Sequence, residues 1–412
     1  MQLVSPPPCP VVPLTCALVC VLAASVAKDG AQDGAREATA SAARVRDVRD
    51  LSALLERERE GEDLIGLAAV VVTSDGVVAR GAAGVRVAGG DTAVTEGDLW
   101  HLGSCTKAMT AVLVARMVDA EELAFDTEFA DAAPDALPED GANEAYDGLT
   151  LLELVHHRSG FGSEFDDRAL WAELWRREGT PVEQRRRLAR AMLAKEPAVV
   201  RGTYRYSNAN YALAGHACEV VADTPWEELV ESRVFAPLHI TTAGQGVPWV
   251  GTPPTQPFGH GADGEPVPPG PFADNPPAIA PGGTVHMSID DWAKFVRAVL
   301  RGARGEDDEF LHRGTWETLL EPVPFGKGGD GYACGWIVTT RPWAKGDGEG
   351  DTGRVLTHTG TNNSWVATCW IAPERDFAVL VTTNRGGGDA TQRVDRVVGA
   401  VLMDHLAAGD GR

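Results

Sequence analysis

The sequence predicts an α+β fold in which one antiparallel sheet is built from both ends of the chain. Strand patterns occupy residues 65–87, directly after a first amphipathic helix. Further strand patterns lie between residues 333 and 383, directly before a final amphipathic helix. Helical patterns dominate about residues 100–300. We therefore expect the terminal helices to cover one face of the sheet and this helical subdomain to cover the other face.

The first helix is predicted by apolar residues that recur at helical spacing: Val45, Val48, Leu51, Leu54 and Leu55. Residues 65–73 form a continuous apolar, β-branched run, 74–76 read as a turn, and 77–87 return as a second strand. A further helix is expected to begin at Ser104. Because residues 108–118 are apolar almost all round, this helix should be buried at the centre of the domain.

Capping signals define the helices of the middle region. Thr150 caps a short helix over residues 151–157, and Thr180 with Glu183 forms a capping box for the next helix. We interpret the arginine-rich residues 185–190 of that helix as a solvated face. Other helices are expected over residues 226–234 and, after the cap at residues 288–291, through residue 299.

Residues 245–283 are too rich in Pro and Gly, and too long, for an ordinary connection, so we expect them to shape a cleft or lid. They contain a formal GxGxxG at residues 259–264. No predicted strand precedes it, so the dinucleotide-binding interpretation fails. The chain then returns to strands over residues 333–340, 354–357, 364–371 and 377–383, and ends in a helix around residues 394–402.

The composition limits the classes of partner and cofactor. The 412 residues are 44% hydrophobic, enough for a sizeable core. The formal net charge of −22 predicts a surface that repels phosphate backbones, so we expect no nucleic-acid partner. The histidines and cysteines show no metal-ligand spacing, and we expect neither a metal nor another cofactor. Cys334 and Cys369 could pair if their strands are neighbours, but free buried thiols are the simpler expectation.

The N-terminus resembles an export signal. The apolar run over residues 11–27 ends in a small-x-small site before Lys28, which predicts a signal peptide over residues 1–27 with cleavage near Ala27. The protein would then be secreted or periplasmic; an uncleaved N-terminal membrane anchor is the alternative. Residues 28–44, rich in Ala, Asp, Gly and Ser, predict a flexible spacer. Residues 45–408 would form the folded domain.

Ser104 and Lys107 form a Ser-x-x-Lys motif at the start of the predicted central helix. Positions i and i+3 share one helix face, so the hydroxyl and the amine should be neighbours. Burial lowers a lysine pKa and lets the amine act as a general base, so the pair could be a nucleophile and its base. The motif is common by chance: Ser25 and Lys28 repeat it in the signal peptide.

Two further motifs add to this pair. Tyr206 and Asn208 form a Tyr-x-Asn, in which the tyrosine could relay a proton, with a neighbouring ammonium favouring phenolate, and the amide could bridge lysine and substrate. Residues 358–361 (His358, Thr359, Gly360 and Thr361) follow a strand. A glycine there would let a substrate backbone lie close, and edge N–H groups could bind an extended ligand and its oxyanion.

These three motifs, in this order, resemble the serine β-lactamase and penicillin-binding protein superfamily. Within it the chain looks like the branch that holds class C β-lactamases, D-alanyl-D-alanine carboxypeptidases and esterases. The resemblance runs from about residue 65 to 406 and includes the flanking residues 97–103, 149–154, 159–160, 280–283 and 335–336. It implies the β-lactamase/transpeptidase-like α+β fold and acyl transfer to water through a covalent acyl-enzyme.

The resemblance also implies a role for each matching residue. Ser104 would be the acyl-accepting nucleophile. Lys107, alone or with Tyr206, would take its proton, and Tyr206 would pass a proton to the leaving group. Asn208 would hold the substrate amide. The N–H groups of Ser104 and Thr361 would form the oxyanion hole.

The strand motif carries the one departure from the pattern. Thr359 would contact the substrate carboxylate, and many β-lactamases have a lysine where this chain has His358. A neutral imidazole attracts a carboxylate less than an ammonium does. This departure favours carboxypeptidase or esterase chemistry over efficient β-lactam hydrolysis.

The sequence therefore predicts a serine hydrolase that acts on a D-amino-acid peptide or amide, an ester or a β-lactam. The expected partner is a small-molecule or peptidoglycan-peptide substrate, and the oligomeric state stays open. One alternative is a penicillin-recognising binding protein with slow or no turnover. Another is a scaffold that uses residues 245–283 as a contact surface.

Overall fold

The computed structural model describes residues 48–248, 255–325 and 329–409. The predicted signal peptide, the spacer and Val45 lie outside these described residues. Within the described ranges, none of the helices combines the length and the apolar character that a membrane crossing needs.

The main sheet joins the two ends of the chain, as predicted. In the described part it has nine strands in the order β1-β3-β2-β14-β13-β12-β11-β10-β9, antiparallel except where β1 pairs with β3. Strand β2 lies beside β14 with Val71 opposite Val379, which places N-terminal and C-terminal segments side by side. The strands are β1 (Arg49–Asp50), β2 (Gly66–Thr73), β3 (Gly76–Gly84), β9 (Val323–Pro324), β10 (Gly331–Ala333), β11 (Trp336–Thr340), β12 (Arg354–Thr361), β13 (Val366–Ala372) and β14 (Phe377–Thr383).

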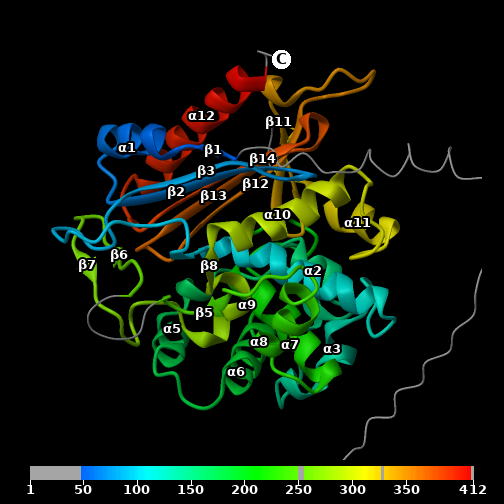
Figure 1. Cartoon of the computed structure of the whole chain (residues 1–412). Coiled ribbons are helices and arrows are strands. Elements are labelled where there is room, and N and C mark those ends of the chain that lie inside the picture. Colours follow the sequence, from blue (N-terminus) through cyan, green and yellow to red (C-terminus); the bar gives the residue numbers. More distant parts are fainter. Residues whose placement is uncertain (1–47, 249–254, 326–328, 410–412) are drawn as a thin grey trace, which may run out of the picture. The chain divides into compact units, whose positions relative to one another are not determined.

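The two faces of the sheet are covered as the sequence predicts (Figure 1). Helices α1 (Ser52–Gly61) and α12 (Ala390–Gly409) pack on one face. Helix α10 (Ile289–Ala303) packs on β2 and β14 from the other face. Each face of the sheet has its own hydrophobic core. Because side chains alternate along a strand, Val71 and Val379 belong to the core on the α1 and α12 face, whereas neighbours such as Leu380 belong to the core on the α10 face.

The helical subdomain is organised around α2 (Thr106–Asp119), in which every residue from Thr106 to Ala115 is buried. This confirms the predicted central helix. Its other helices are α3 (Phe129–Ala132), α4 (Leu151–Val155), α5 (Arg168–Leu174), α6 (Pro181–Leu193), α7 (Asn208–Ala222), α8 (Trp226–Val230), α9 (Ala280–Gly283) and α11 (Arg313–Leu320). Short strands β4 (Leu99–His101), β8 (Val285–Ser288) and β5 (Gly244–Gln245) form a second sheet.

Several predicted elements have different bounds, and two of these differences have a clear physical cause. The first helix begins only at Ser52, because Arg49 and Asp50 pair with β3 and the Asp50 carboxylate accepts a hydrogen bond from the Ser52 N–H at 2.8 Å. The single strand expected over residues 333–340 is a hairpin of β10 and β11. Cys334 and Gly335 both have positive φ, 38° and 102°, and this conformation turns the chain between β10 and β11.

The interpretation of the arginine run as a solvated face is wrong for Arg185. This side chain is fully buried and pairs with Glu219 and, at 2.8 Å, with Glu227. Helix α6 packs on α7, and the two carboxylates compensate the charge that this packing buries. Arg186 and Arg187 keep partly exposed side chains, as the periodicity predicts.

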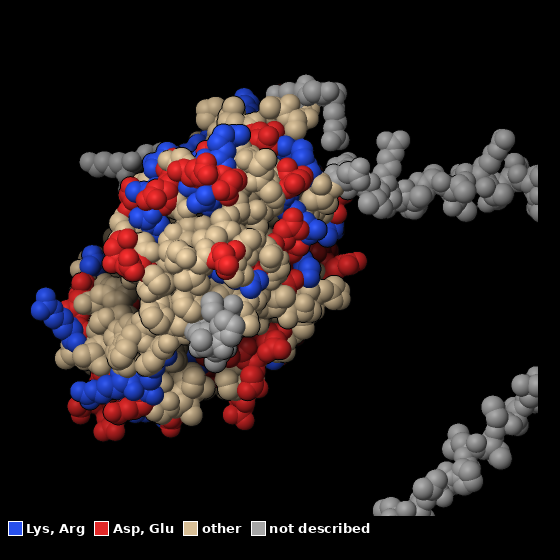
Figure 2. Space-filling model, turned by 60° about the vertical axis from the view of Figure 1, so that its left-hand side comes forward, with Lys and Arg blue, Asp and Glu red and all other residues tan. Residues whose placement is uncertain are grey.

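The cysteines and the glycine-rich loop agree with the simpler expectations. Cys334 and Cys369 are free and buried: Cys334 lies in the turn between β10 and β11, and β12 separates that hairpin from β13, which holds Cys369. In residues 245–283, β6 (Gly259–His260) and β7 (Pro266–Val267) form a small hairpin, so the GxGxxG leads into a strand and not into a helix. Basic and acidic side chains are interspersed over the face seen in Figure 2.

Candidate active site

Ser104 lies in the tight turn that feeds the central helix. Residues Gly103–Cys105 form a 3₁₀ turn, and α2 begins at Thr106, two residues later than the predicted start. The turn packs directly against β12. A Cβ atom on Gly360 would lie 2.6 Å from the Ser104 nitrogen, and one on Gly103 would collide with the Thr361 nitrogen. Glycine at both positions therefore brings the serine against the strand.

Lys107 stands one turn further along and is fully buried. Its Nζ donates hydrogen bonds to Ser104 Oγ at 3.1 Å, to Asn208 Oδ1 at 2.7 Å and to the Gly282 carbonyl at 2.6 Å. Burial lowers the pKa of Lys107 from 10.5 to about 7, although the Glu164 carboxylate opposes the shift. At pH 7 about half of the amine is therefore neutral and able to accept a proton.

Tyr206 approaches Ser104 from the opposite side to the lysine. Its hydroxyl donates to Ser104 Oγ at 2.8 Å, and its ring centroid lies 4.7 Å from Lys107 Nζ. The side chain is 39% exposed, while its hydroxyl points inward to the serine. Desolvation of the hydroxyl raises the pKa of Tyr206 above its ordinary value, so the expected phenolate does not form near neutral pH. Tyr206 is a proton donor here.

Asn208 is the first residue of α7, and both polar atoms of its amide have protein partners. Oδ1 accepts from Lys107, and Nδ2 donates to Glu164 Oε1 at 2.6 Å. The carboxylate can only accept, so it sets the direction of the amide. Glu164, Asn208 and Lys107 thus form one hydrogen-bonded chain that ends at Ser104.

Glu164 is a site residue that the sequence did not reveal. It is fully buried at the start of a 3₁₀ turn over Glu164–Asp166, and it also accepts from the Ser207 hydroxyl at 3.3 Å. In the sequence it is one acid in a polar loop. The sequence indicates it only indirectly: if the Asn208 oxygen accepts from a buried lysine, the N–H groups of the same amide need an acceptor elsewhere in the chain.

His157 is the second residue that sequence reasoning missed. It is fully buried with a positive φ of 57°. Its Nδ1 accepts from Asn210 Nδ2 at 3.0 Å, and its ring centroid lies 4.4 Å from that of Tyr206. Burial holds the pKa of His157 well below its usual range, so the ring is neutral. It acts as an aromatic support for Tyr206.

The strand motif, residues 358–361, contacts the Ser104 turn with its backbone and not with its side chains. His358 is buried, donates from Nδ1 to the Gly335 carbonyl, and has a pKa lowered to about 4 by burial and by the Lys107 charge. It is therefore neutral at pH 7, as expected. The Thr359 hydroxyl bonds to Thr368 Oγ1 at 3.1 Å. Among the described residues, no hydrogen bond joins this hydroxyl to the Ser104 network.

The free edge of β12 runs beside Ser104. Strand β11 pairs with β12 only as far as Thr357. Residues 358–361 have β13 on one side and, among the described strands, none on the other. Their unpaired edge and the Ser104 turn together form a place where an extended ligand could add as a further strand.

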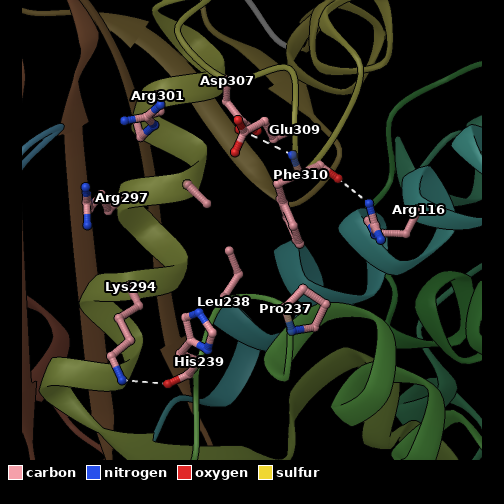
Figure 3. Close-up of a pocket in the computed structure, with 11 residues that line it drawn as sticks. Arg116, Pro237, Leu238, His239, Lys294, Arg297, Arg301, Asp307, Glu309 and Phe310 are labelled. Carbon is pink, nitrogen blue, oxygen red and sulfur yellow. Dashed lines mark hydrogen bonds between the residues drawn. The ribbon is translucent and has the colours of Figure 1, made fainter. Parts of the chain in front are cut away.

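A cavity of about 530 Å³ lies away from this network (Figure 3). It is bordered by Arg116, near the far end of α2. At a helical rise of 1.5 Å per residue, Arg116 is about 18 Å from Ser104. Its cations serve protein acceptors: Arg116 donates to the Phe310 carbonyl, and Lys294 donates to the His239 carbonyl at 2.6 Å. None of the described residues that line this cavity is a serine, threonine or cysteine, so the Ser104 network is the candidate active site.

Comparison with known proteins agrees with this geometry. Residues 51–402 match the Beta-lactamase family. The chain belongs to this family. Penicillin-binding protein 4 of Amycolatopsis lactamdurans is 31% identical over 175 residues, which cover 42% of this chain and 43% of that protein. Esterase EstB of Burkholderia gladioli is 29% identical over 218 residues, which cover 50% of this chain and 52% of that protein. The chain thus spans about half the length of these curated relatives.

Solved structures confirm the predicted β-lactamase/transpeptidase-like α+β fold. A D-stereospecific amidohydrolase from Streptomyces sp. superposes with a TM-score of 0.64 at 21% identity, covering 83% of this chain and 96% of that one. The octameric penicillin-binding protein homologue from Pyrococcus abyssi gives a TM-score of 0.66 at 20% identity, covering 85% and 76%. At these identities the likeness concerns the fold.

Proposed function

We propose that this chain is a serine hydrolase that transfers the acyl group of an amide or ester first to Ser104 and then to water. The observation that carries the proposal is the position of Ser104 Oγ, which accepts hydrogen bonds from Lys107 Nζ at 3.1 Å and from the Tyr206 hydroxyl at 2.8 Å. A hydroxyl between a lysine of lowered pKa and a protonated phenol can lose its own proton to one group while the other supplies a proton.

The acylation step follows from these protonation states. In its neutral form Lys107 donates its two hydrogens to Asn208 Oδ1 and the Gly282 carbonyl, so that its lone pair faces Ser104 Oγ. It takes the Ser104 proton as Oγ attacks the substrate carbonyl carbon, and the carbonyl electron pair moves onto its oxygen. The backbone N–H groups of Ser104, which lies against Gly360, and of Thr361, which lies against Gly103, would stabilise that oxyanion. Tyr206 then protonates the departing nitrogen or oxygen and regains a proton from the Lys107 ammonium. Attack by water and the reverse proton transfers release the acid.

The substrate is proposed to be an extended amide or ester whose backbone pairs with residues 358–361 of β12. Thr359, on this strand, would bind a substrate carboxylate if its hydroxyl leaves Thr368. The neutral His358 supplies no positive charge for such a carboxylate, which favours peptides, amides and esters over β-lactams. The similarity to proteins named as an esterase and as a D-stereospecific amidohydrolase supports this preference.

A binding protein is the second candidate. The similarity to a protein named penicillin-binding protein 4 favours a site that acylates Ser104 and then turns over slowly or not at all. Both candidates require the same nucleophile. They differ in the lifetime of the acyl-enzyme, which would last for hours in a binding protein.

A hydrolysis panel tests the proposal. It comprises a chromogenic cephalosporin, a D-Ala-D-Ala peptide, a D-amino-acid amide and a short-chain aryl ester. We expect turnover of the ester or an amide, and its loss in Ser104→Ala. The control Ser232→Ala changes an exposed serine of the same subdomain and should keep full activity. Turnover that survives in Ser104→Ala would exclude the proposed nucleophile, and a stable adduct without turnover would favour the binding protein.

A further inference from the structure

Four aromatic side chains form a continuous row beside the candidate active site. Adjacent ring centroids are 4.4 Å apart for Phe165 and Trp171, 5.7 Å for Trp171 and Trp175, and 5.5 Å for Trp175 and Phe272. The row comes from the Glu164–Asp166 turn, from α5 and the residue that follows it, and from the Pro/Gly-rich segment. We call these four residues the aromatic row.

Both ends of the aromatic row are tied to the site. Phe165 directly follows Glu164, which holds the Asn208 amide. Phe272 lies two residues before Asp274, whose carboxylate accepts from Asn362 Nδ2 at 3.0 Å, immediately after the β12 edge. The row therefore spans from the lysine side of the site to the strand side.

The segment that carries Phe272 also reaches the backbone around Lys107. Asn275 Nδ2 donates to the Gly283 carbonyl at 3.2 Å, next to the Gly282 carbonyl that accepts from Lys107. Arg177 fastens this segment to the row: its guanidinium lies 5.6 Å from the Trp175 ring and donates to the Asp274 carbonyl at 2.7 Å. The segment is thus held in place, and the row has a fixed position relative to Ser104.

Exposure of these rings distinguishes the row from a core cluster. Phe165 is 50% exposed and Phe272 is 74% exposed. In the described ranges, the only other exposed Phe, Tyr or Trp side chain is Tyr206, which donates to Ser104. Elsewhere in the described part of the chain the Phe, Tyr and Trp side chains are buried or half-buried, so their exposure is concentrated at this site. A large apolar surface left in water at one place is typical of a binding site.

We propose that the aromatic row recognises the substrate by binding a large apolar, preferably aromatic, group attached near the scissile carbonyl. This inference rests on the proposed function and specifies its substrate class. Aromatic rings pack edge to face or offset against further rings. Phe165 makes a T-shaped contact with Trp171 and Phe272 a tilted contact with Trp175, and both rings keep at least half of their surface open to such a partner. The row selects amide or ester substrates that carry bulky apolar substituents over substrates whose acyl group is as small as acetyl.

The test compares two nitrophenyl ester series, one that varies the acyl group from acetyl to phenylbutyryl and one that varies an apolar substituent on the leaving group. We expect the double variant Phe165→Ala/Phe272→Ala to lower kcat/KM for the bulky aromatic esters about tenfold or more, while the acetyl ester changes less than about twofold. Met403→Ala, which removes an exposed apolar side chain from α12, is the matched control and should change neither. Equal effects on small and bulky esters in both series would overturn the inference.

A binding measurement separates this inference from the proposed function. In Ser104→Ala, we expect a non-hydrolysable aromatic amide to quench tryptophan fluorescence, and we expect quenching to weaken in a variant that also carries Phe165→Ala and Phe272→Ala. If Ser104→Ala keeps its turnover, the proposed nucleophile fails, yet this titration still tests the row. If Ser104→Ala is inactive and the titration is unchanged by the aromatic substitutions, the row is not the recognition surface.

Discussion

Replacing Glu164 by glutamine removes one negative charge from the lysine site and leaves its hydrogen bonds in place. The glutamine Oε1 can still accept from Asn208 Nδ2, and its Nε2 can donate to the Ser207 hydroxyl, which now acts as an acceptor. The Asn208 amide therefore keeps its oxygen toward Lys107. The substitution isolates the electrostatic contribution of Glu164 from its positioning role.

The size of that contribution follows from the geometry. The bonds of 2.6 Å and 2.7 Å on either side of the Asn208 amide put the Glu164 and Lys107 charges about 6 Å apart, which gives an interaction of about 3 kcal/mol at an effective dielectric constant of 20. The other groups beside Lys107 add no compensating charge. Burial keeps the imidazoles of His157 and His358 neutral and keeps the Tyr206 phenol protonated at pH 7.

The assay is the pH profile of kcat/KM with an aryl ester. Neutral Lys107 is the proposed base, so activity should rise with pH through its pKa of about 7 in the wild type. Glu164 raises that pKa, so Glu164→Gln should move the acid limb to lower pH, by up to about two pH units. Asp166→Asn, which neutralises an exposed acid of the same turn, should leave the limb in place. An unmoved limb, or one moved to higher pH, in Glu164→Gln would refute the assignment of Lys107 as the base.

Three further predictions concern packing and stability. Gly360→Ala forces a Cβ onto the Ser104 turn and should lower kcat/KM about 100-fold, whereas Gly399→Ala, which meets nothing within 4 Å in α12, should keep activity and raise the free energy of unfolding by about 0.5–1 kcal/mol. Arg185→Ala removes the cationic partner of the buried Glu219 and of the partly buried Glu227, and should cost about 3–5 kcal/mol in urea unfolding, against less than about 0.5 kcal/mol for the half-exposed Arg186→Ala; equal costs would contradict the buried network. Between pH 7 and 9 the unfolded chain binds more protons at Lys107 than the folded chain does, so the free energy of unfolding of the wild type, relative to that of Lys107→Met, should rise by up to about 1.4 kcal/mol per pH unit. A difference between the two proteins that does not change with pH would mean that Lys107 has an ordinary lysine pKa.

The sequence predicted most of the architecture because the signals were local. The apolar run of β2, the all-round apolar α2 and the capping residue Thr150 each act within a few residues of one another. The bounds that were wrong depend on distant partners. Pairing with β3 delays the start of α1, and a tight turn at Gly335 packs on Ala108 and splits a predicted strand.

The site shows the same division. Ser104, Lys107, Tyr206 and Asn208 have recognisable spacings, and the structure joins them by hydrogen bonds. Glu164 has no such spacing, since its role depends on a loop that folds back onto α7. The prediction for Arg185 is wrong for a related reason: helical periodicity marks one face as polar but does not show that α7 will cover this face and that Glu219 and Glu227 will pair with the buried charge. Positions that depend on contacts distant in sequence become visible only in the fold.

The most direct measurement of the central claim is the mass of the intact chain during reaction with a slowly deacylating nitrophenyl ester. We predict one covalent adduct with the mass of the acyl group, located on the peptide that contains Ser104 and absent in Ser104→Ala. Its formation should follow the same pH limb as kcat/KM, since both depend on neutral Lys107. An adduct on any other residue, or ester turnover without an acylated intermediate in Ser104→Ala, would contradict the account.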